Sequence, residues 1–169
     1  MRETSVRHLV LSGLFLALGL VLPFLTAQVP SVGSMLLPMH IPVLLCGFVC
    51  GWPYGLIIGL VTPLLRSALF GMPPMFPTAV AMAFELAAYG FATGLLYRLL
   101  PKKNIHIYTS LILSMILGRI VWGIASLFLF GISGKPFTWE IFMAGAFINA
   151  IPGIVIQLIL IPIVLMALK

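Results

Sequence analysis

Three charged residues interrupt long apolar stretches of the sequence: Arg66, Glu85 and Arg119. A charge within hydrocarbon is costly even on lenient scales, so such residues usually face a cavity or one another. An arginine can hold a carboxylate or another acceptor, and a glutamate can accept hydrogen bonds from donor groups. These residue types therefore indicate either a buried ion pair or a binding site for a polar solute.

Aromatic and polar residues recur at helical spacing beside two of these charges. Tyr89 follows Glu85 by four residues, and Trp122 and Ser126 follow Arg119 by three and seven. Residues at such spacing share one face of a helix. The pattern predicts aromatic walls and hydrogen-bonding groups next to the charges.

Further polar residues lie near the two ends of the chain. Gly153 and Gln157 follow Asn149 by four and eight residues, so they share its helical face. His40 stands between Pro38 and Pro42. We expect His40 either to line the entrance of a site or to cap a helix that these prolines break.

Catalytic motifs are absent from the sequence. The chain has no aspartate, no H-E-x-x-H, no G-x-S-x-G and no phosphate-binding loop;. Cys46 and Cys50 lie in an apolar run without a ligand set, which predicts a packing role;. We therefore expect no enzyme activity, no cofactor and no metal.

The composition excludes ordinary soluble proteins. Hydrophobic residues make up 62% of the 169 residues and charged residues 7%, whereas soluble domains contain roughly 25% charged residues. The mean hydropathy is +1.25. Such a chain cannot bury its apolar surface in one core and keep a polar shell. The sequence predicts a membrane protein, whose net charge of +6 reflects topology and not nucleic-acid binding;.

The apolar stretches predict an all-α membrane protein with about six transmembrane helices, since about 20 apolar residues span a bilayer. Turn-like segments separate them, the first at Gln28 to Ser34;. No room remains for a soluble domain, so we expect one integral membrane domain over residues 1–169. The predicted spans are His8 to Ala27, Leu36 to Gly51, Tyr54 to Phe70, Phe76 to Leu99, Ile107 to Gly131 and Glu140 to Leu168.

The distribution of basic residues predicts the orientation, because short basic loops stay cytoplasmic. With six spans, the basic positions outside the spans share one side of the membrane. The opposite side carries only Lys135 and Glu140 in its loops. Both termini are therefore predicted to be cytoplasmic. The basic residues behind this prediction are Arg2, Arg7, Arg98, Lys102, Lys103 and Lys169.

A rise of about 1.5 Å per residue places the polar residues of the spans at similar depth. Arg66 and Arg119 lie about 18 Å from the cytoplasmic start of their helices. Glu85 and Asn149 lie about 14 Å below the outer start of theirs. In a hydrocarbon core about 30 Å thick, all four occupy one level, from the midplane into the outer half.

Two arrangements fit this level of polar groups. Glu85 and Arg119 could form a structural ion pair, with Asn149 hydrogen-bonded across helices. Alternatively, they line a pocket open to the outside. We favour the pocket, because two arginines and one glutamate leave one positive charge for an anionic or acceptor-rich ligand. The predicted substrate-binding residues are Glu85, Arg119, Asn149, Arg66, Tyr89, Trp122 and His40.

Two predicted spans carry small residues four apart, which let helices approach closely. Gly13 and Ala17 lie in the first span, and Gly55 and Gly59 lie in the third. Internal packing and docking against another membrane protein both fit this pattern.

The chain as a whole resembles the substrate-binding S components of energy-coupling factor (ECF) vitamin transporters. The resemblance covers essentially the full length and is carried by loose, apolar motifs. They are Leu-Ser-Gly-Leu-Phe-Leu-Ala-Leu-Gly-Leu-Val-Leu-Pro at 11–23, Pro-Met-His-Ile-Pro-Val-Leu-Leu-Cys-Gly at 38–47, and Asn-Ala-Ile-Pro-Gly-Ile-Val-Ile-Gln at 149–157.

The resemblance implies a division of labour among subunits. An S component in a prokaryotic plasma membrane binds a water-soluble vitamin or precursor from outside and rotates in the membrane to release it inside. A transmembrane T component and two cytoplasmic ATPases supply the energy. The family's contact with the T component maps onto Gly13 and Ala17, with Gly in place of the more usual Ala.

The resemblance also implies where the substrate binds. Family members use the outer halves of the later helices and the loops joining the first to the second and the third to the fourth spans. The stretch from Met72 to Phe76 would then be a gating loop, although an ordinary proline-rich turn also fits.

The substrate is less defined than the family. The surplus arginine favours pantothenate, while Trp122 and Tyr89 keep a pyridoxine-like compound, riboflavin or another aromatic precursor open. Two rival functions also fit the sequence. One is a stand-alone proton-coupled transporter that uses Glu85, and the other is an intramembrane enzyme or assembly factor.

Overall fold

The computed structural model describes residues 2–26, 35–101 and 103–168. Helical elements dominate these ranges, which contain no strand. The predicted turn from Gln28 to Ser34 and the predicted end of the first span at Ala27 lie outside them. The elements are α1 (Arg2–Val21), η1 (Leu22–Thr26), α3 (His40–Cys50), α4 (Trp52–Phe70), η2 (Met75–Ala79), α5 (Val80–Leu99), α6 (Asn104–Ile132), α7 (Trp139–Met143), η3 (Ala144–Ile148) and α8 (Ile151–Ala167).

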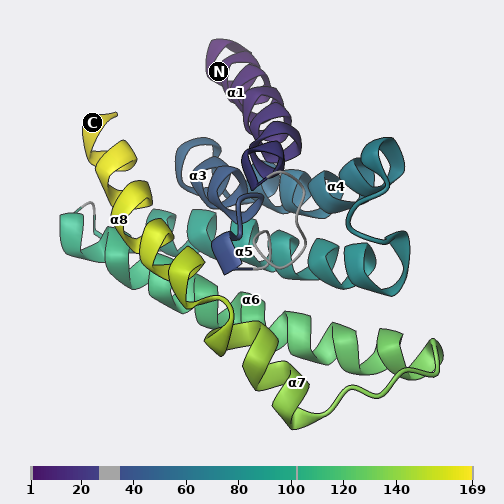
Figure 1. Ribbon diagram of the computed structural model, residues 1–169. Helices are drawn as coiled ribbons and strands as arrows, with labels where there is room; N and C mark the ends of the chain where they lie inside the picture. Colours follow the sequence, from purple (N-terminus) through teal and green to yellow (C-terminus); the bar gives the residue numbers. More distant parts are fainter. Residues whose placement is uncertain (1, 27–34, 102, 169) are drawn as a thin grey trace.

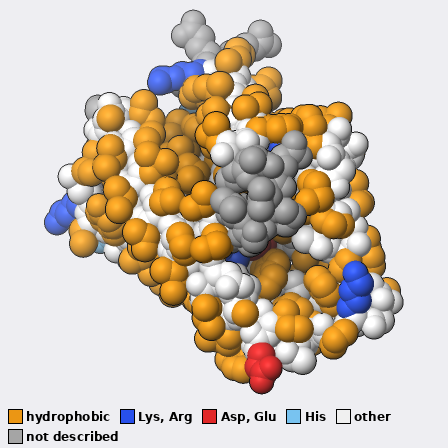
Figure 2. Space-filling view, in the orientation of Figure 1, with side chains coloured by type: hydrophobic (Ala, Val, Ile, Leu, Met, Phe, Trp, Pro, Cys, Tyr) orange, Lys and Arg blue, Asp and Glu red, His pale blue; other side chains and the backbone are white. Residues whose placement is uncertain are grey.

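The all-α membrane architecture predicted from the sequence is confirmed. Within the described ranges, five segments are long and apolar enough to cross a membrane. Apolar side chains cover most of the face seen in Figure 2, where charged side chains are sparse. Lipid is the solvent that such a surface requires. The five segments are Val6–Leu25, Trp52–Phe70, Met75–Leu99, Asn104–Ile132 and Trp139–Ala167.

The second predicted span is wrong in its start and length. α3 begins at His40 instead of Leu36 and has 11 residues, which make about 16 Å of helix. A residue before a proline avoids the helical region, and Leu37, before Pro38, has a φ of 51°. α3 is apolar all round and buried along nearly its whole length, as expected for a helix enclosed by others. It is a short central helix, not a full span.

The last predicted span is interrupted in the structure. The short helix α7 continues into the π-helical turn η3, and Asn149 and Ala150 form a turn before α8. Pro152 occupies the first turn of α8, where its missing N–H group costs no helical hydrogen bond. The break places η3 beside the cavity described below, which its residue Phe147 lines.

Helix α5 occupies the middle of the bundle and contacts α3, α4 and α6. In Figure 1 the turn between α4 and α5 and the connection from α6 to α7 lie towards the right. The connection from α5 to α6 and the C-terminus lie towards the left. The N-terminus lies at the top of the same view, and the cytoplasmic placement of the termini stays a prediction.

The interface between α4 and α5 is built around glycines. A Cβ atom at Gly55 would meet the carbonyl oxygen of Gly90, and one at Gly59 would meet the carbonyl oxygen of Leu86. Such close backbone approaches require small residues. Internal packing is therefore the role of the small residues in the third predicted span.

Helix α1 packs against α3 and α4 with one face. Ser12, Phe15 and Gly19 are buried on that face, whereas Gly13 and Ala17 are exposed. A Cβ atom at Gly13 would meet nothing within 4 Å among the described residues. The opposite face of α1 therefore presents a small-residue patch flanked by exposed apolar side chains. These neighbours are Leu9, Val10, Leu14, Leu18 and Val21.

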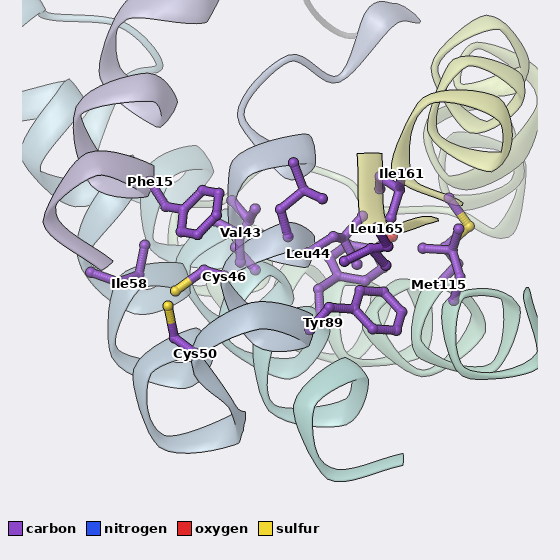
Figure 3. Close-up of a cluster of buried hydrophobic side chains, with 14 of the residues drawn as sticks. Phe15, Val43, Leu44, Cys46, Cys50, Ile58, Tyr89, Met115, Ile161 and Leu165 are labelled. Carbon is purple, nitrogen blue, oxygen red and sulfur yellow. The ribbon is translucent and has the colours of Figure 1, made fainter. Parts of the chain in front are cut away.

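The apolar core joins α1, α3 and α4 to the later helices. Figure 3 shows Cys46 and Cys50 of α3 in one buried cluster with Phe15 of α1 and Ile58 of α4. Both cysteines are free and buried. Because thiols behave as small hydrophobic groups in such surroundings, the cysteines act here as core side chains.

Candidate functional site

Glu85 of α5 is the centre of a buried polar cluster that joins three helices. Its Oε1 atom lies 2.8 Å from Nη1 of Arg119 on α6. The same atom lies 3.4 Å from Nε2 of His40 at the start of α3. Tyr89 lies one helical turn further along α5, and its buried ring packs against His40. One carboxylate thus contacts side chains from α3 and α6.

The cluster is almost completely enclosed. Glu85 is 1% exposed and Arg119 is 5% exposed. The rings of His40 and Tyr89 meet edge to face, with their centroids 5.3 Å apart. A charge in such surroundings is tolerated when it is paired. The ion pair therefore compensates Arg119 within the bundle.

A cavity of about 300 Å³ lies between α5, α6 and α8, beside this cluster. Arg119, Tyr89 and Gln157 are its polar lining residues. Glu85 lies behind Arg119 and is not among the lining residues. The remaining walls are aliphatic or aromatic and come from α6, η3 and α8. They are Ile112, Met115, Ile116, Phe147, Ile154 and Leu158.

Two polar lining residues retain unused hydrogen-bonding capacity. The Nη2 atom of Arg119 and the Nε2 atom of Gln157 are buried, and neither has a hydrogen-bond partner among the described residues. Gln157 is 1% exposed. A buried donor without a partner costs about 1–3 kcal/mol. Both nitrogen atoms belong to side chains that line the cavity, so they are candidate donors to a ligand acceptor.

Arg66 lies in a different environment from the other charged residues. Its Nη1 atom donates a hydrogen bond of 2.5 Å to the carbonyl oxygen of Leu20. Its guanidinium group lies 4.9 Å from the ring centroid of Phe24 and 5.4 Å from that of Phe70. Cation–π contacts and the hydrogen bond therefore hold Arg66 between α4 and the end of α1. Arg66 is not among the residues that line this cavity, and its predicted contact with substrate stays a prediction.

The other predicted site residues are divided between the cluster and its surroundings. Tyr89 belongs to both the cluster and the cavity wall. His40 contacts Glu85 at the start of α3 and is not a cavity-lining residue. Asn149 is exposed in the turn before α8, and it too lies outside the cavity lining. The predicted substrate contacts of these residues stay predictions.

Trp122 belongs to an aromatic cluster at the C-terminal half of α6. Its ring stacks on Phe142 of α7 with centroids 6.1 Å apart and meets Phe137 edge to face at 5.6 Å. Phe142 in turn contacts Phe147, which lines the cavity. Trp122 therefore supports the cavity wall through Phe142 instead of forming it.

Among the polar residues that line the cavity, Gln157 is the one that is not among the predicted substrate-binding residues. The sequence does contain a signal, because Gln157 is a lone amide within the apolar stretch that forms α8. Polar residues at membrane depth usually face the bundle interior. The contact between His40 and Glu85 had no such signal, since it depends on where α3 begins.

No group of three or more His, Cys, Asp or Glu residues that could hold a metal ion occurs in the described ranges. The stretch from Met72 to Phe76 connects α4 to η2, and Gly71 adopts the left-handed conformation at the end of α4. Met75 and Phe76 are exposed there. The gating role of this stretch stays a prediction.

Comparison with models of known protein families identifies the family of this chain. The family model described as "ECF transporter, substrate-specific component" matches residues 7–165. The comparison with curated proteins gives no significant match, and neither does the comparison with solved structures. The family match covers nearly the whole chain and confirms the resemblance found in the sequence. The chain therefore belongs to the substrate-specific components of ECF transporters.

Proposed function

We propose that this multi-pass membrane protein captures a compact water-soluble vitamin or vitamin precursor in the cavity between α5, α6 and α8. The observation that carries the proposal is the pair of buried donors on Arg119 and Gln157, which lack partners beside a cavity of about 300 Å³. Small-molecule sites combine apolar walls with a few polar groups that fix the orientation of the ligand. This cavity has that composition.

The volume of the cavity ranks the candidate substrates by how well their size fits it. About 300 Å³ is at the lower end of the volumes usual for ligand pockets. Pantothenate and a pyridoxine-like compound are compact and fit this range better than riboflavin, which has three fused rings. The sequence favoured pantothenate because of the surplus arginine, and that support is lost because Arg66 lies away from the cavity.

Transport requires partners that this chain does not supply. The family is one of substrate-binding transport components and not of enzymes. We infer that a transmembrane T component and two cytoplasmic ATPases drive the release of the substrate to the inside of a prokaryotic cell. In this scheme the chain provides specificity, and the partners provide the energy.

The exposed small-residue patch on α1 is the proposed contact with the T component. Gly13 and Ala17 lie on the α1 face that points away from α3 and α4. Small residues at this spacing let a second helix approach closely within lipid. Gly55 and Gly59 are buried between α4 and α5, so they cannot serve this purpose.

The experiment that tests the binding proposal is thermal unfolding of the detergent-purified protein against a panel of vitamins and precursors. A ligand that binds only the folded state raises the melting temperature by mass action. The panel contains pantothenate, pyridoxine, riboflavin, nicotinamide and nicotinate. We expect a concentration-dependent shift with at least one compact compound.

Two variants make the test specific for the cavity. Gln157→Leu should reduce the shift, because it removes a lining donor. Arg66→Met replaces a buried arginine outside the cavity and should leave the shift unchanged. Equal loss in both variants, or uptake by the isolated chain that collapses with the proton gradient, would contradict the proposal and favour a secondary transporter.

A further inference from the structure

The charges beside the cavity bear on whether the substrate is charged, which membership of the family does not specify. Arg119 is the only charged residue among those lining the described cavity. Its guanidinium group is already paired with Glu85 at 2.8 Å. The ion pair of Glu85 and Arg119 therefore has no net charge.

A carboxylate brought into this cavity would be a second negative charge for one positive charge. Burying an ion without its own counter-charge is costly in a low-dielectric interior. The second arginine that could have balanced it, Arg66, is held by Leu20, Phe24 and Phe70. The described part of the chain therefore offers no second cation at the cavity.

The hydrogen-bonding groups favour an uncharged acceptor instead. The free nitrogen atoms of Arg119 and Gln157 are donors;. A carbonyl, amide or hydroxyl oxygen can accept from both without adding charge. The remaining walls are apolar side chains such as Ile116, Ile154 and Leu158, which match an apolar ligand body.

We propose that the cavity selects an uncharged, compact solute with one hydrogen-bond acceptor directed at Arg119 and Gln157 and an apolar body against α6 and α8. This inference rests on the proposed function and narrows its substrate class. Glu85 is then a positioning residue that sets charge preference through Arg119, without touching the substrate.

Matched pairs of compounds that differ in one charge test the inference. The pairs are panthenol with pantothenate, nicotinamide with nicotinate, and pyridoxine with 4-pyridoxate. Dissociation constants are measured for the purified full chain at pH 7. For the pair that the cavity accepts, we expect the neutral member to bind at least about tenfold more tightly, a difference of about 1.4 kcal/mol.

A charge-removal variant distinguishes the proposed role of Glu85 from a purely structural one. The quantity measured is the ratio of affinities for the neutral and the anionic member of a pair. Glu85→Gln keeps the size of the side chain and leaves Arg119 without a counter-charge. We expect the preference to shift at least about tenfold towards the anionic member. The control is Glu140→Gln, which removes an exposed carboxylate on α7 and should leave the preference unchanged.

The outcomes separate this inference from the proposed function. Tighter binding of an anionic member to the wild-type protein would overturn the inference and leave the substrate-binding function intact. Absence of binding by every compound to a folded, ligand-stripped protein would overturn both. If Glu85→Gln does not fold, the comparison of pairs on the wild-type protein still decides the inference.

Discussion

The interface between α4 and α5 and the one between α6 and α8 are built from different kinds of residue. Gly55, Gly59 and Gly90 bring the backbones of α4 and α5 into direct contact. Between α6 and α8, by contrast, large aliphatic side chains and Gln157 border a cavity. Close backbone packing leaves no volume for a ligand, whereas large side chains that do not interlock leave space. The first interface is therefore scaffold, and the second borders the cavity in which we propose that the substrate binds.

The largest effect is expected from a substitution that disrupts the interface between α4 and α5. In Gly59→Leu, the new side chain would meet the backbone of Leu86 and Ala87, which cannot move aside. Overpacking of this kind should cost about 3 kcal/mol or more, and we expect little monodisperse protein in size-exclusion chromatography. The control is Gly131→Leu, at a position with nothing within 4 Å. Equal recovery of both variants would contradict the tight interface.

The next effect in size concerns the ion pair beside the cavity. Arg119→Ala leaves Glu85 buried with its main counter-charge removed, which should cost about 3–5 kcal/mol. Arg66→Ala, which strands no carboxylate, should cost less, about 1–2 kcal/mol for a lost hydrogen bond and ring contacts. Thermal unfolding of both variants measures the difference.

A double variant measures how much of that loss of stability comes from the unpaired Glu85 carboxylate. Adding Glu85→Gln to Arg119→Ala should restore part of the lost stability, because no unpaired carboxylate remains. If the double variant were less stable than Arg119→Ala alone, the cost would come from lost packing and not from the charge.

The sequence predicted the helices well where a long apolar stretch determines the span. It predicted them poorly where prolines determine the helix boundary. Spans of 19 to 29 residues are long apolar stretches that have no alternative but to cross the bilayer. α3 is a different case, because the apolar pattern continues through Leu36 and Leu37, whereas the helix is interrupted at Leu37, which precedes Pro38 and has a φ of 51°;. Composition alone cannot show that a helix this short is enclosed by others.

Depth along a helix was a partial guide to the site. It placed Glu85 and Arg119 at one level, where the structure pairs them. It placed Arg66 at the same level, but depth does not give the direction in which a side chain points around the bundle. Arg66 faces α1 and η1, so equal depth did not mean a shared site. The direction depends on helix packing, which a single sequence leaves open.

A smaller effect on stability is expected from a substitution at the cavity between α6 and α8. Gln157→Leu should change the free energy of unfolding by less than about 1 kcal/mol, because it replaces a buried donor without a partner by an apolar group. Ligand affinity should fall by about tenfold. Isothermal titration with the best ligand of the panel checks this, with Ile156→Leu on the exposed face of α8 as control. A large stability loss with unchanged affinity would make Gln157 a structural residue.

The smallest effect on the isolated protein is expected at Gly13, outside both interfaces. Because a side chain there meets nothing within 4 Å, Gly13→Leu should leave folding and ligand binding unchanged. It should still weaken co-purification with the T component severalfold, since a bulky residue keeps a partner helix away. Gly13→Ala keeps the residue small and should preserve the complex. Normal assembly of Gly13→Leu with the T component would show that the exposed face of α1 contacts lipid alone.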